Sequence, residues 1–194
     1  PHLDVPEVIA LERGGTLIMR VTDQAGVLLP AIVTLDMYRP GSIVTAALDT
    51  STGVAEYNDA PAGSAVVVVR SLGFAPAAVR ITIEAGRVHV LPDFVLSHAA
   101  DLSGVVLEAT GTPIANARLV ASYGAGWPLS RTLTNLLGRD VRTAEDGAFR
   151  IRAVVPGLPL RLYAEFDGRR SQEMLVTLGA GETRRDVVVT LPID

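Results

Sequence analysis

Apolar and polar residues alternate in several short segments of the chain, with the period of two that places side chains on opposite faces of a β-strand. Val79–Glu84, Ala148–Arg152 and Arg161–Phe166 follow this alternation, which predicts half-buried strands. Ala65–Val69 and Asp186–Val189 are instead nearly continuous β-branched runs. These runs are too short for buried helices and favour buried strands. The pattern therefore predicts a protein built from β-strands.

Glycine and proline separate these segments at the positions expected of turns. Thr52-Gly53 and Asp146-Gly147 lie between predicted strands, where a tight turn needs a positive φ that glycine adopts at little cost. Pro61–Gly63 and Pro156-Gly157 mark a second pair of turns. Short strands with turn signals about every 8–12 residues are typical of sandwiches. We predict an all-β fold of antiparallel Greek-key β-sandwich type.

The turn and core residues recur at nearly constant offsets, which indicates an internal repeat. The offset is 85 residues, then 94 and finally 95, in the pairs Leu17 and Leu102, Gly53 and Gly147, and Leu96 and Leu191. A single step of nine or ten residues means two copies of one unit, with an insertion in the second copy at about residues 122–142. We predict two consecutive sandwich domains over residues 14–97 and 98–194, joined too closely to drift far apart.

Residues 1–13 precede the first copy, as a tail or as the end of a preceding repeat. Within them, Val8–Leu11 occupies the place that Phe94–Leu96 occupies before the second copy. This segment is predicted to be either a first strand of the first domain or the closing strand of a preceding repeat. The second alternative would make the chain a slice of a longer array.

The second copy carries a recognisable series of motifs over Leu102–Val106, Gly111–Val120, Thr143–Ile151 and Val155–Gly157. This series closely resembles the carboxypeptidase regulatory-like module, a small transthyretin-like (prealbumin-like) β-sandwich. The first copy resembles a degenerate version of the same module. The matching positions are turns and core residues, so they specify the fold well and the function poorly.

What the resemblance implies is a location and a type of role. Such modules occur as repeats in bacterial secreted, periplasmic and cell-surface proteins, and as accessory domains behind catalytic domains. The resemblance therefore implies an extracellular, periplasmic or cell-surface protein in which the module acts as a spacer, a stabiliser or an interaction surface. Active-site residues are not part of the motif, so no catalytic residue is carried over.

Composition narrows the function classes further. With 17 basic and 21 acidic residues the formal net charge is −4, which argues against a nucleic-acid partner because phosphate contacts need a basic surface. The longest stretches without a charged residue are far shorter than the roughly 20 residues of a membrane-spanning helix, so no span is expected. The chain has no Cys and no Lys, which excludes disulfides, thiolate metal sites and lysine chemistry.

Few residues suggest chemistry. His2, His89 and His98 lack the spacing of metal ligands, and no G-x-S-x-G elbow is present. We therefore expect no catalytic, cofactor-binding or metal site, and no cofactor. Two arginine pairs, Arg169-Arg170 and Arg184-Arg185, flank predicted strands. They are predicted either to protect sheet edges or to bind an anion such as an acidic polysaccharide.

The insertion is the unusual feature of the second copy. Pro128 can begin a short helix, leucines at 129, 133, 136 and 137 follow a helical spacing, and Gly138 can end it. We predict that this helix caps one open end of the sandwich with its leucines buried. Tyr123, Trp127 and Arg131 are of the types favoured at binding contacts, so they form a candidate contact surface. The two interpretations are compatible.

Two functions are consistent with these observations. The first is a non-catalytic structural or interaction module, serving spacing, assembly or adhesion within a larger exported bacterial protein. Its partners would be other domains of that protein or another protein. The alternative is a carbohydrate-binding accessory module of a secreted enzyme, with a glycan as ligand. An aromatic content of 5% with a single Trp disfavours this alternative, because sugar sites need exposed aromatic rings.

Overall fold

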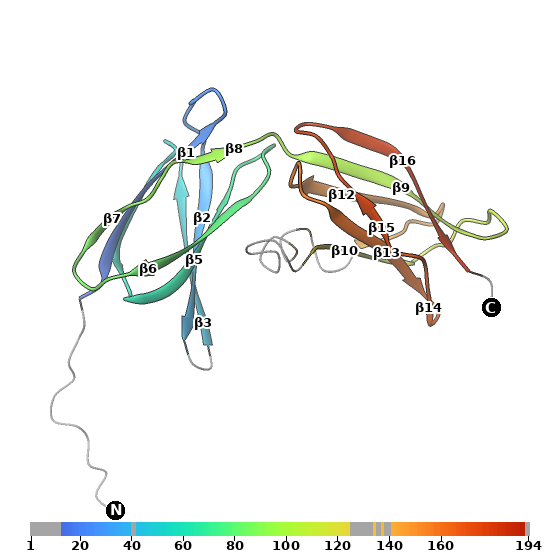
Figure 1. Ribbon diagram of the computed structural model, residues 1–194, viewed down its shortest axis with the longest axis horizontal. Helices are drawn as coiled ribbons and strands as arrows, with labels where there is room; N and C mark the ends of the chain where they lie inside the picture. Colours follow the sequence, from blue (N-terminus) through green and yellow to red (C-terminus); the bar gives the residue numbers. More distant parts are fainter. Residues whose placement is uncertain (1–12, 40–41, 125–133, 135–136, 138–140, 193–194) are drawn as a thin grey trace, which may run out of the picture.

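The computed structural model describes residues 13–39, 42–124, 134, 137 and 141–192 (Figure 1). Within these ranges the chain forms sixteen β-strands, so the predicted all-β class is confirmed. The strands form two sandwich-like bodies that lie side by side (Figure 1). We call the body of β1–β8 domain 1 and the body of β9–β16 domain 2. The helix predicted over 128–138 falls outside the described residues, apart from Thr134 and Leu137.

Domain 1 consists of two sheets. Sheet 1a has the order β4-β1-β7, with β8 also pairing with β1, and sheet 1b has the order β3-β2-β5-β6. The strands are β1 (Gly15–Asp23), β2 (Ala31–Arg39), β3 (Ser42–Thr50), β4 (Val54–Ala60), β5 (Gly63–Arg70), β6 (Ala77–Ile83), β7 (Val88–Val90) and β8 (Phe94–Leu96).

Domain 2 repeats this arrangement. Sheet 2a has the order β12-β9-β16, and sheet 2b has the order β11-β10-β13-β14, with β15 also pairing with β13. The strands are β9 (Ala100–Glu108), β10 (Arg118–Tyr123), β11 (Val141–Arg142), β12 (Ala148–Val154), β13 (Leu160–Phe166), β14 (Arg169–Arg170), β15 (Met174–Val176) and β16 (Thr183–Leu191).

The strand register confirms the internal repeat residue by residue. Val21 pairs with Phe94 in domain 1, and Val106 pairs with Val189 in domain 2, so the partners recur 85 and 95 residues later. The antiparallel neighbours of β1 and β9 recur in the same way. Their corresponding pairs are Leu17 with Tyr57 and Leu102 with Ile151, and Met19 with Ala55 and Gly104 with Phe149. The two copies therefore share one backbone plan, down to the place of a β-bulge, which puts an extra residue in β4 of domain 1 and in β12 of domain 2.

Most neighbouring strands are antiparallel, and the first and last strands of each domain are the exception. β1 pairs in parallel with β7 and β8, and β9 pairs in parallel with β16. Alternation along a strand does not encode its direction, because side chains alternate equally in parallel and antiparallel ladders. The parallel closure therefore comes from the topology, which returns the last strand of each unit beside the first.

The glycines at one turn illustrate why the copies share this plan. Gly53 and Gly147 have φ angles of 74° and 75°, as predicted from their place between strands. A Cβ atom at Gly53 would lie 2.8 Å from the Leu29 nitrogen, and one at Gly147 would lie 2.7 Å from the Val106 oxygen. Both the left-handed conformation and the close backbone approach require glycine here.

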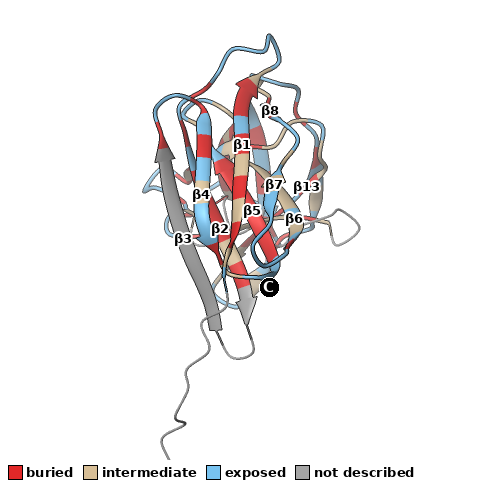
Figure 2. Ribbon diagram, turned by 90° about the vertical axis from the view of Figure 1, so that its left-hand side faces the viewer, coloured by how far each residue is buried: buried red, intermediate tan, exposed pale blue. Residues whose placement is uncertain are grey.

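Each domain encloses its own apolar core. Leu17, Met19, Val21 and Leu96 are among the largest buried side chains of domain 1, whereas Leu102, Ile151, Leu160 and Leu162 hold the same place in domain 2. The alternation along β1 and β9 supplies Leu17, Met19, Val21 and Leu102 from every second position of these strands. The strand β5 differs, because it is buried at five successive residues (Figure 2).

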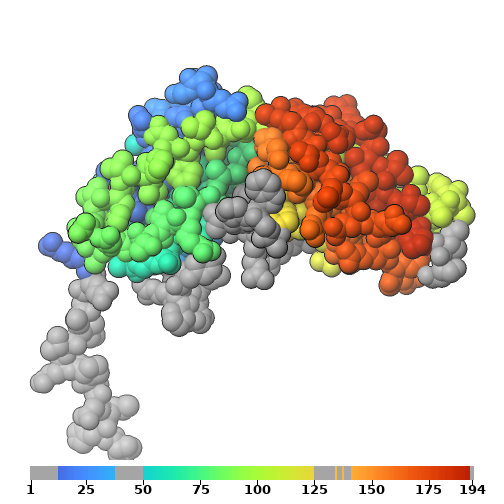
Figure 3. Space-filling model, in the orientation of Figure 1, coloured from blue at the N-terminus to red at the C-terminus, as the bar shows by residue number. Residues whose placement is uncertain are grey.

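The short joint between the domains is tied to both. The Ala75 nitrogen donates a hydrogen bond to the Ser97 oxygen at 2.9 Å, and the Ala99 nitrogen donates one to the Gly73 oxygen at 3.0 Å. The rings of Phe74 and His98 stack with centroids 4.8 Å apart. The segment that follows β8 is thus held against the β5–β6 loop of domain 1, and the two bodies meet closely (Figure 3).

Candidate functional site

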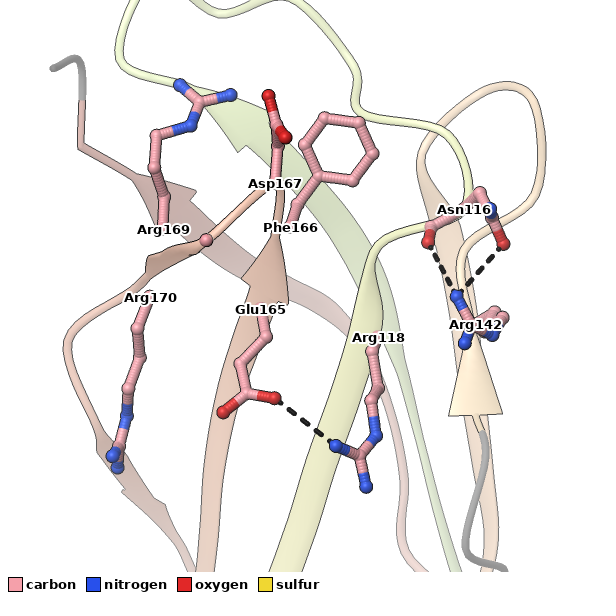
Figure 4. A pocket seen from close by; sticks show the side chains of 9 residues that line it. Asn116, Arg118, Arg142, Glu165, Phe166, Asp167, Arg169 and Arg170 are labelled. Carbon is pink, nitrogen blue, oxygen red and sulfur yellow. Dashed lines mark hydrogen bonds and ion pairs between the residues drawn. The ribbon is translucent and has the colours of Figure 1, made fainter.

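A hollow of about 680 Å³ lies at one end of sheet 2b and is rich in arginine (Figure 4). It is lined by Asn116, Arg118, Arg142, Glu165, Phe166, Asp167, Gly168, Arg169 and Arg170. These residues come from β10, β11, β13 and β14, from the β9–β10 loop and from the β13–β14 turn. Residues far apart in the sequence therefore meet here because the sheet places their strands side by side.

Four of the lining residues form one row across the sheet, which we call the arginine row. Arg142 is paired with Arg118, Arg118 with Glu165, and Glu165 with Arg170, each across neighbouring strands. Neighbouring strands are about 4.8 Å apart. In Figure 4 the side chains of Arg118, Glu165 and Arg170 extend to the same side of the sheet. That side is the outer face, since Leu119 and Ala164, the next residues along β10 and β13, are buried in the core.

Hydrogen bonds and ion pairs hold the row in place. Arg118 Nη1 lies 3.3 Å from Glu165 Oε2. Arg142 Nη1 donates to both the backbone oxygen and Oδ1 of Asn116 at 3.3 Å (Figure 4). The guanidinium of Arg118 remains about half exposed, so a ligand can reach it.

Arg170 is oriented by stacking. Its guanidinium carbon lies 3.7 Å above the centroid of the Tyr163 ring, a cation–π contact that leaves the planar edge of the group open to hydrogen-bond acceptors. Arg170 Nη2 also lies 3.6 Å from Glu173 Oε2, and the Arg170 side chain is 53% exposed. The stacked guanidinium is therefore pre-oriented and accessible at once.

A two-residue turn joins β13 to β14 at the mouth of the hollow. Asp167 and Gly168 have φ angles of 49° and 75°, as a type I′ hairpin turn requires. Because the turn is this short, Phe166 pairs directly with Arg169, and Glu165 with Arg170. The Asp-Gly turn thus fixes the register that brings Arg170 into the row. Arg169 is largely buried and contacts Glu108 and the Pro192 oxygen.

The sequence predicted part of this site. Arg169-Arg170 was expected either to protect an edge or to bind an anion, and Arg170 lies in the row. Arg118 and Arg142 were not expected to join it, because their place depends on the pairing of β10 with β11 and β13. Arg184, of the second predicted pair, contacts Glu182 and the Thr177 oxygen instead. The one sequence feature that could have indicated Arg118 is its place before an apolar residue, Leu119, in a predicted strand, since such a position points outward.

Of the three residues predicted to form a contact surface at the insertion, the structure describes only Tyr123. Trp127 and Arg131 lie outside the described residues. Tyr123 is 4% exposed, and its hydroxyl oxygen accepts a hydrogen bond from the Val155 nitrogen at 2.8 Å. Burial raises the pKa of this phenol to about 12. The structure differs here from the surface position that we expected, because the outermost inward position of β10 is needed to close the core.

Two residues of the insertion are described and belong to the end of domain 2. Leu137 is buried in the domain 2 core. This agrees with the prediction that the leucines of the insertion are buried, at the one leucine of the four that the structure describes. Thr134 Oγ1 accepts a hydrogen bond from the Tyr123 nitrogen at 2.9 Å. These contacts tie the insertion to the strand that precedes it.

The histidines serve structural contacts. His89 Nε2 accepts a hydrogen bond from the Glu84 nitrogen at 3.0 Å, and His98 stacks on Phe74 in the joint. Among the described residues, no three His, Asp or Glu side chains gather as metal ligands would. Within the same ranges, no helix has the length and apolar character needed to cross a membrane.

Comparison with known proteins places domain 2 in a family. Residues 101–192 match the carboxypeptidase regulatory-like domain family, whereas no curated protein matches the chain.

Solved structures similar to the chain include GBS52, the minor pilin of Streptococcus agalactiae, with 12% identity, coverage of 93% of this chain and 96% of that chain, and a TM-score of 0.45. The shaft pilin SpaA of Lactobacillus rhamnosus GG has 12% identity, coverage of 95% and 98%, and a TM-score of 0.40. The Bacillus anthracis TIE protein has 14% identity and a TM-score of 0.40 over 93% of this chain. The chain spans about a third, 34%, of that structure.

Proposed function

We propose that this chain, whose residues 101–192 form a carboxypeptidase regulatory-like domain, is a non-catalytic structural module of a larger exported bacterial protein. Its two transthyretin-like domains, over residues 14–97 and 98–194, hold the parts on either side at a fixed spacing and orientation. Its partners are other domains of the same protein or a second protein. The candidate contact surface at Trp127 and Arg131 belongs to this proposal.

The observation that carries the proposal is the construction of the joint. A free linker would leave its backbone groups to water, but here both sides of His98 are bonded to domain 1 through Ser97 and Ala99. The His98 oxygen also accepts a hydrogen bond from the Gly181 nitrogen of domain 2 at 3.2 Å. A joint that is bonded to both domains resists bending, which is the mechanical property that a spacer needs.

The outer face of sheet 1b supports the same proposal. Val66 and Val68 point away from the domain 1 core, yet their exposed fractions are 0% and 2%. Ala78, which is paired with Val68 on the same face, packs against the core cluster of domain 2. Burial of apolar area stabilises by about 25 cal/mol per Å², so domain packing at this face opposes hinge motion.

The distance between the domains tests this proposal directly. The chain has no Cys, so a pair of introduced cysteines at Ala85 and Ala109, both exposed, can be spin-labelled without background. Pulsed electron spin resonance should give one narrow distance distribution. The Phe74→Ala, His98→Ala double variant should broaden it, because the stacking contact that fixes the joint is lost.

Leu72→Ala is the matched control. Leu72 lies two residues from Phe74 and is 99% exposed, so removing its side chain disturbs no packing and should leave the distribution narrow. A broad distribution in the labelled chain without the joint substitutions would contradict the proposal.

A further inference from the structure

The outer face of sheet 2b carries positive charge in a chain whose net charge is negative. Arg118, Arg142, Arg161 and Arg170 lie on this face, and Glu165 and Glu173 lie among them. Among the described residues, these four arginines face three carboxylates when Asp167 at the mouth of the hollow is included, a local excess of one positive charge, whereas the whole chain is at −4. A cationic patch on an acidic protein attracts anions to one place.

The guanidinium groups present the right donors for carboxylates. Arginine offers planar, paired N–H groups that match the two oxygens of a carboxylate. Arg170 is held in one orientation by Tyr163 at 3.7 Å and by Glu173 at 3.6 Å, so little conformational entropy is lost when its exposed guanidinium binds a ligand. Arg118 and Arg170 flank Glu165 in the row, and with strands about 4.8 Å apart their backbones are about 10 Å apart.

The carboxylates in the hollow select against densely charged polymers. Glu165 lies between two arginines of the row, and Asp167 lies at the mouth. A polyphosphate or a nucleic acid, which carries a charge on every unit, would be repelled at both positions. A hydroxyl group, by contrast, can donate a hydrogen bond to each of these oxygens. The mixture of acceptors and cationic donors therefore suits a ligand with both hydroxyls and spaced carboxylates.

The shape of the hollow agrees with this chemistry. The hollow has a volume of about 680 Å³, and its lining includes Phe166, which is partly buried against the domain 2 core (Figure 4). The row crosses the strands, whereas a peptide added to a sheet edge would run along them, so a peptide strand would not meet the arginines in series.

We propose that the arginine row and its hollow bind an acidic polysaccharide of the uronate type, in which carboxylated and hydroxyl-rich sugar units follow one another. This second role goes beyond the spacer function, and neither depends on the other. The ligand lies across β11, β10, β13 and β14. Its carboxylates contact Arg118 and Arg170, and its hydroxyls donate hydrogen bonds to Glu165 and Asp167.

Isothermal titration of the full chain with an oligogalacturonate tests the proposal. Binding is expected at low ionic strength and should weaken as salt rises, since ion pairs at an exposed surface are screened. The Arg118→Gln, Arg170→Gln double variant should bind about tenfold more weakly or not at all, because it lacks both carboxylate contacts. A neutral maltooligosaccharide should not bind.

The matched control is the Arg152→Gln, Arg185→Gln double variant, which removes the same charge from exposed positions of β12 and β16 in the other sheet. It should keep the affinity of the unchanged chain. Equal loss in both double variants, or stronger binding of polyphosphate than of oligogalacturonate, would overturn the proposal in favour of unspecific charge attraction. Absence of oligogalacturonate binding would also overturn it. Circular dichroism of each variant establishes that the fold is retained.

Discussion

The outward positions of β5 in sheet 1b and of β13 in sheet 2b occupy equivalent places in the two copies and differ in burial and charge. Val33 pairs with Val69 in domain 1 as Leu119 pairs with Ala164 in domain 2. With this register, the buried Val66 of β5 corresponds to Arg161 of β13. Val66 is fully buried, whereas the Arg161 side chain is 51% exposed. One backbone plan therefore supports a buried valine at this outward position in one copy and an exposed arginine in the other.

The contrast separates two demands on the same strand. Inward positions of β5 and β13 must be apolar in both copies, because each domain needs its own core. Outward positions respond only to what lies outside the domain. Val68 faces the side on which Ala78 meets the core cluster of domain 2, while the equivalent Tyr163 supports Arg170 at the surface. The outer face is therefore where the copies are free to take different functions.

Exchanging Val66 and Arg161, which occupy equivalent positions in the two domains, should have the largest and most unequal effect on stability. Val66→Arg forces a charged and much longer side chain into a fully buried site and should lower the free energy of unfolding by about 3–5 kcal/mol. The reciprocal Arg161→Val removes only the exposed ion pair with Glu173 at 3.6 Å and should change it by less than about 1 kcal/mol. Urea unfolding of both variants measures the two effects.

A loss below about 1 kcal/mol for Val66→Arg would contradict the tight burial of this face. A loss of several kcal/mol for Arg161→Val would show that the arginine-rich face contributes to folding and is not free to serve binding alone. Val66→Ile, which keeps an apolar side chain, distinguishes charge burial from a simple steric effect.

Tyr123 should give the next largest effect. It corresponds to Met37 of domain 1, since Met37 pairs with Ala65 as Tyr123 pairs with Leu160. Tyr123→Phe leaves the Val155 nitrogen without the hydroxyl acceptor at 2.8 Å and should cost about 1–2 kcal/mol at neutral pH. Met37→Leu, at the position that needs no hydroxyl, should cost less than about 1.5 kcal/mol.

The raised pKa of Tyr123 predicts a loss of unfolding free energy at alkaline pH. Burial raises the pKa of the Tyr123 phenol from 10.0 to about 12, so the folded state disfavours the phenolate. Stability from this group is complete below pH 10 and is lost as pH rises through 12, by up to about 3 kcal/mol. Tyr123→Phe should lack this part of the alkaline loss. Urea unfolding of the unchanged chain and of Tyr123→Phe at a series of alkaline pH values measures this difference. An equal loss of unfolding free energy in both proteins would contradict the assignment to Tyr123.

The smallest expected effect concerns the turns before the last strands. Glu182 of domain 2 accepts a hydrogen bond from the Gly179 nitrogen at 2.7 Å and pairs with Arg184, which together lower the pKa of this carboxyl below 4.5. Its contribution is present above pH 4.5 and is lost as pH falls through the lowered pKa. Domain 1 has Arg87 at the equivalent position, paired with Glu84.

Glu182→Gln should therefore make the unfolding free energy less dependent on pH below 4.5, with little change at neutral pH. Arg87→Gln is the control in domain 1 and should leave the pH dependence of Glu182 unchanged. Urea unfolding over a series of acidic buffers measures both. An unaltered acid dependence in Glu182→Gln would show that other carboxylates carry it.

Much of the fold was accessible from the sequence because its determinants are local. Strands such as Ala148–Val154 follow from alternation, and turns such as those at Gly53 and Gly147 follow from the need for a positive φ. The repeat offsets predicted two copies of one unit, and the pairings of Val21 with Phe94 and of Val106 with Val189 follow the same offsets.

The candidate site was less accessible because it is assembled across strands. Arg118 and Arg170 are distant in the chain and become neighbours only through β13, and no local pattern states which strands pair. Tyr123 also shows that residue type alone does not decide whether a side chain lies at the surface or in the core. Its residue type suits a contact surface, but the last inward position of β10 and the Val155 nitrogen make it a core residue with a satisfied hydroxyl.

The amino-acid sequence by itself determined the β-class, the turns and the existence of two copies, because hydrophobic alternation and backbone sterics act between residues that are near one another in the chain. Tertiary structure alone decided the parallel closing strands, the burial of the outward face of β5 and the row of Arg118, Glu165 and Arg170. These features depend on which segments meet in space. That choice is made by the packing of whole sheets, which no single segment encodes.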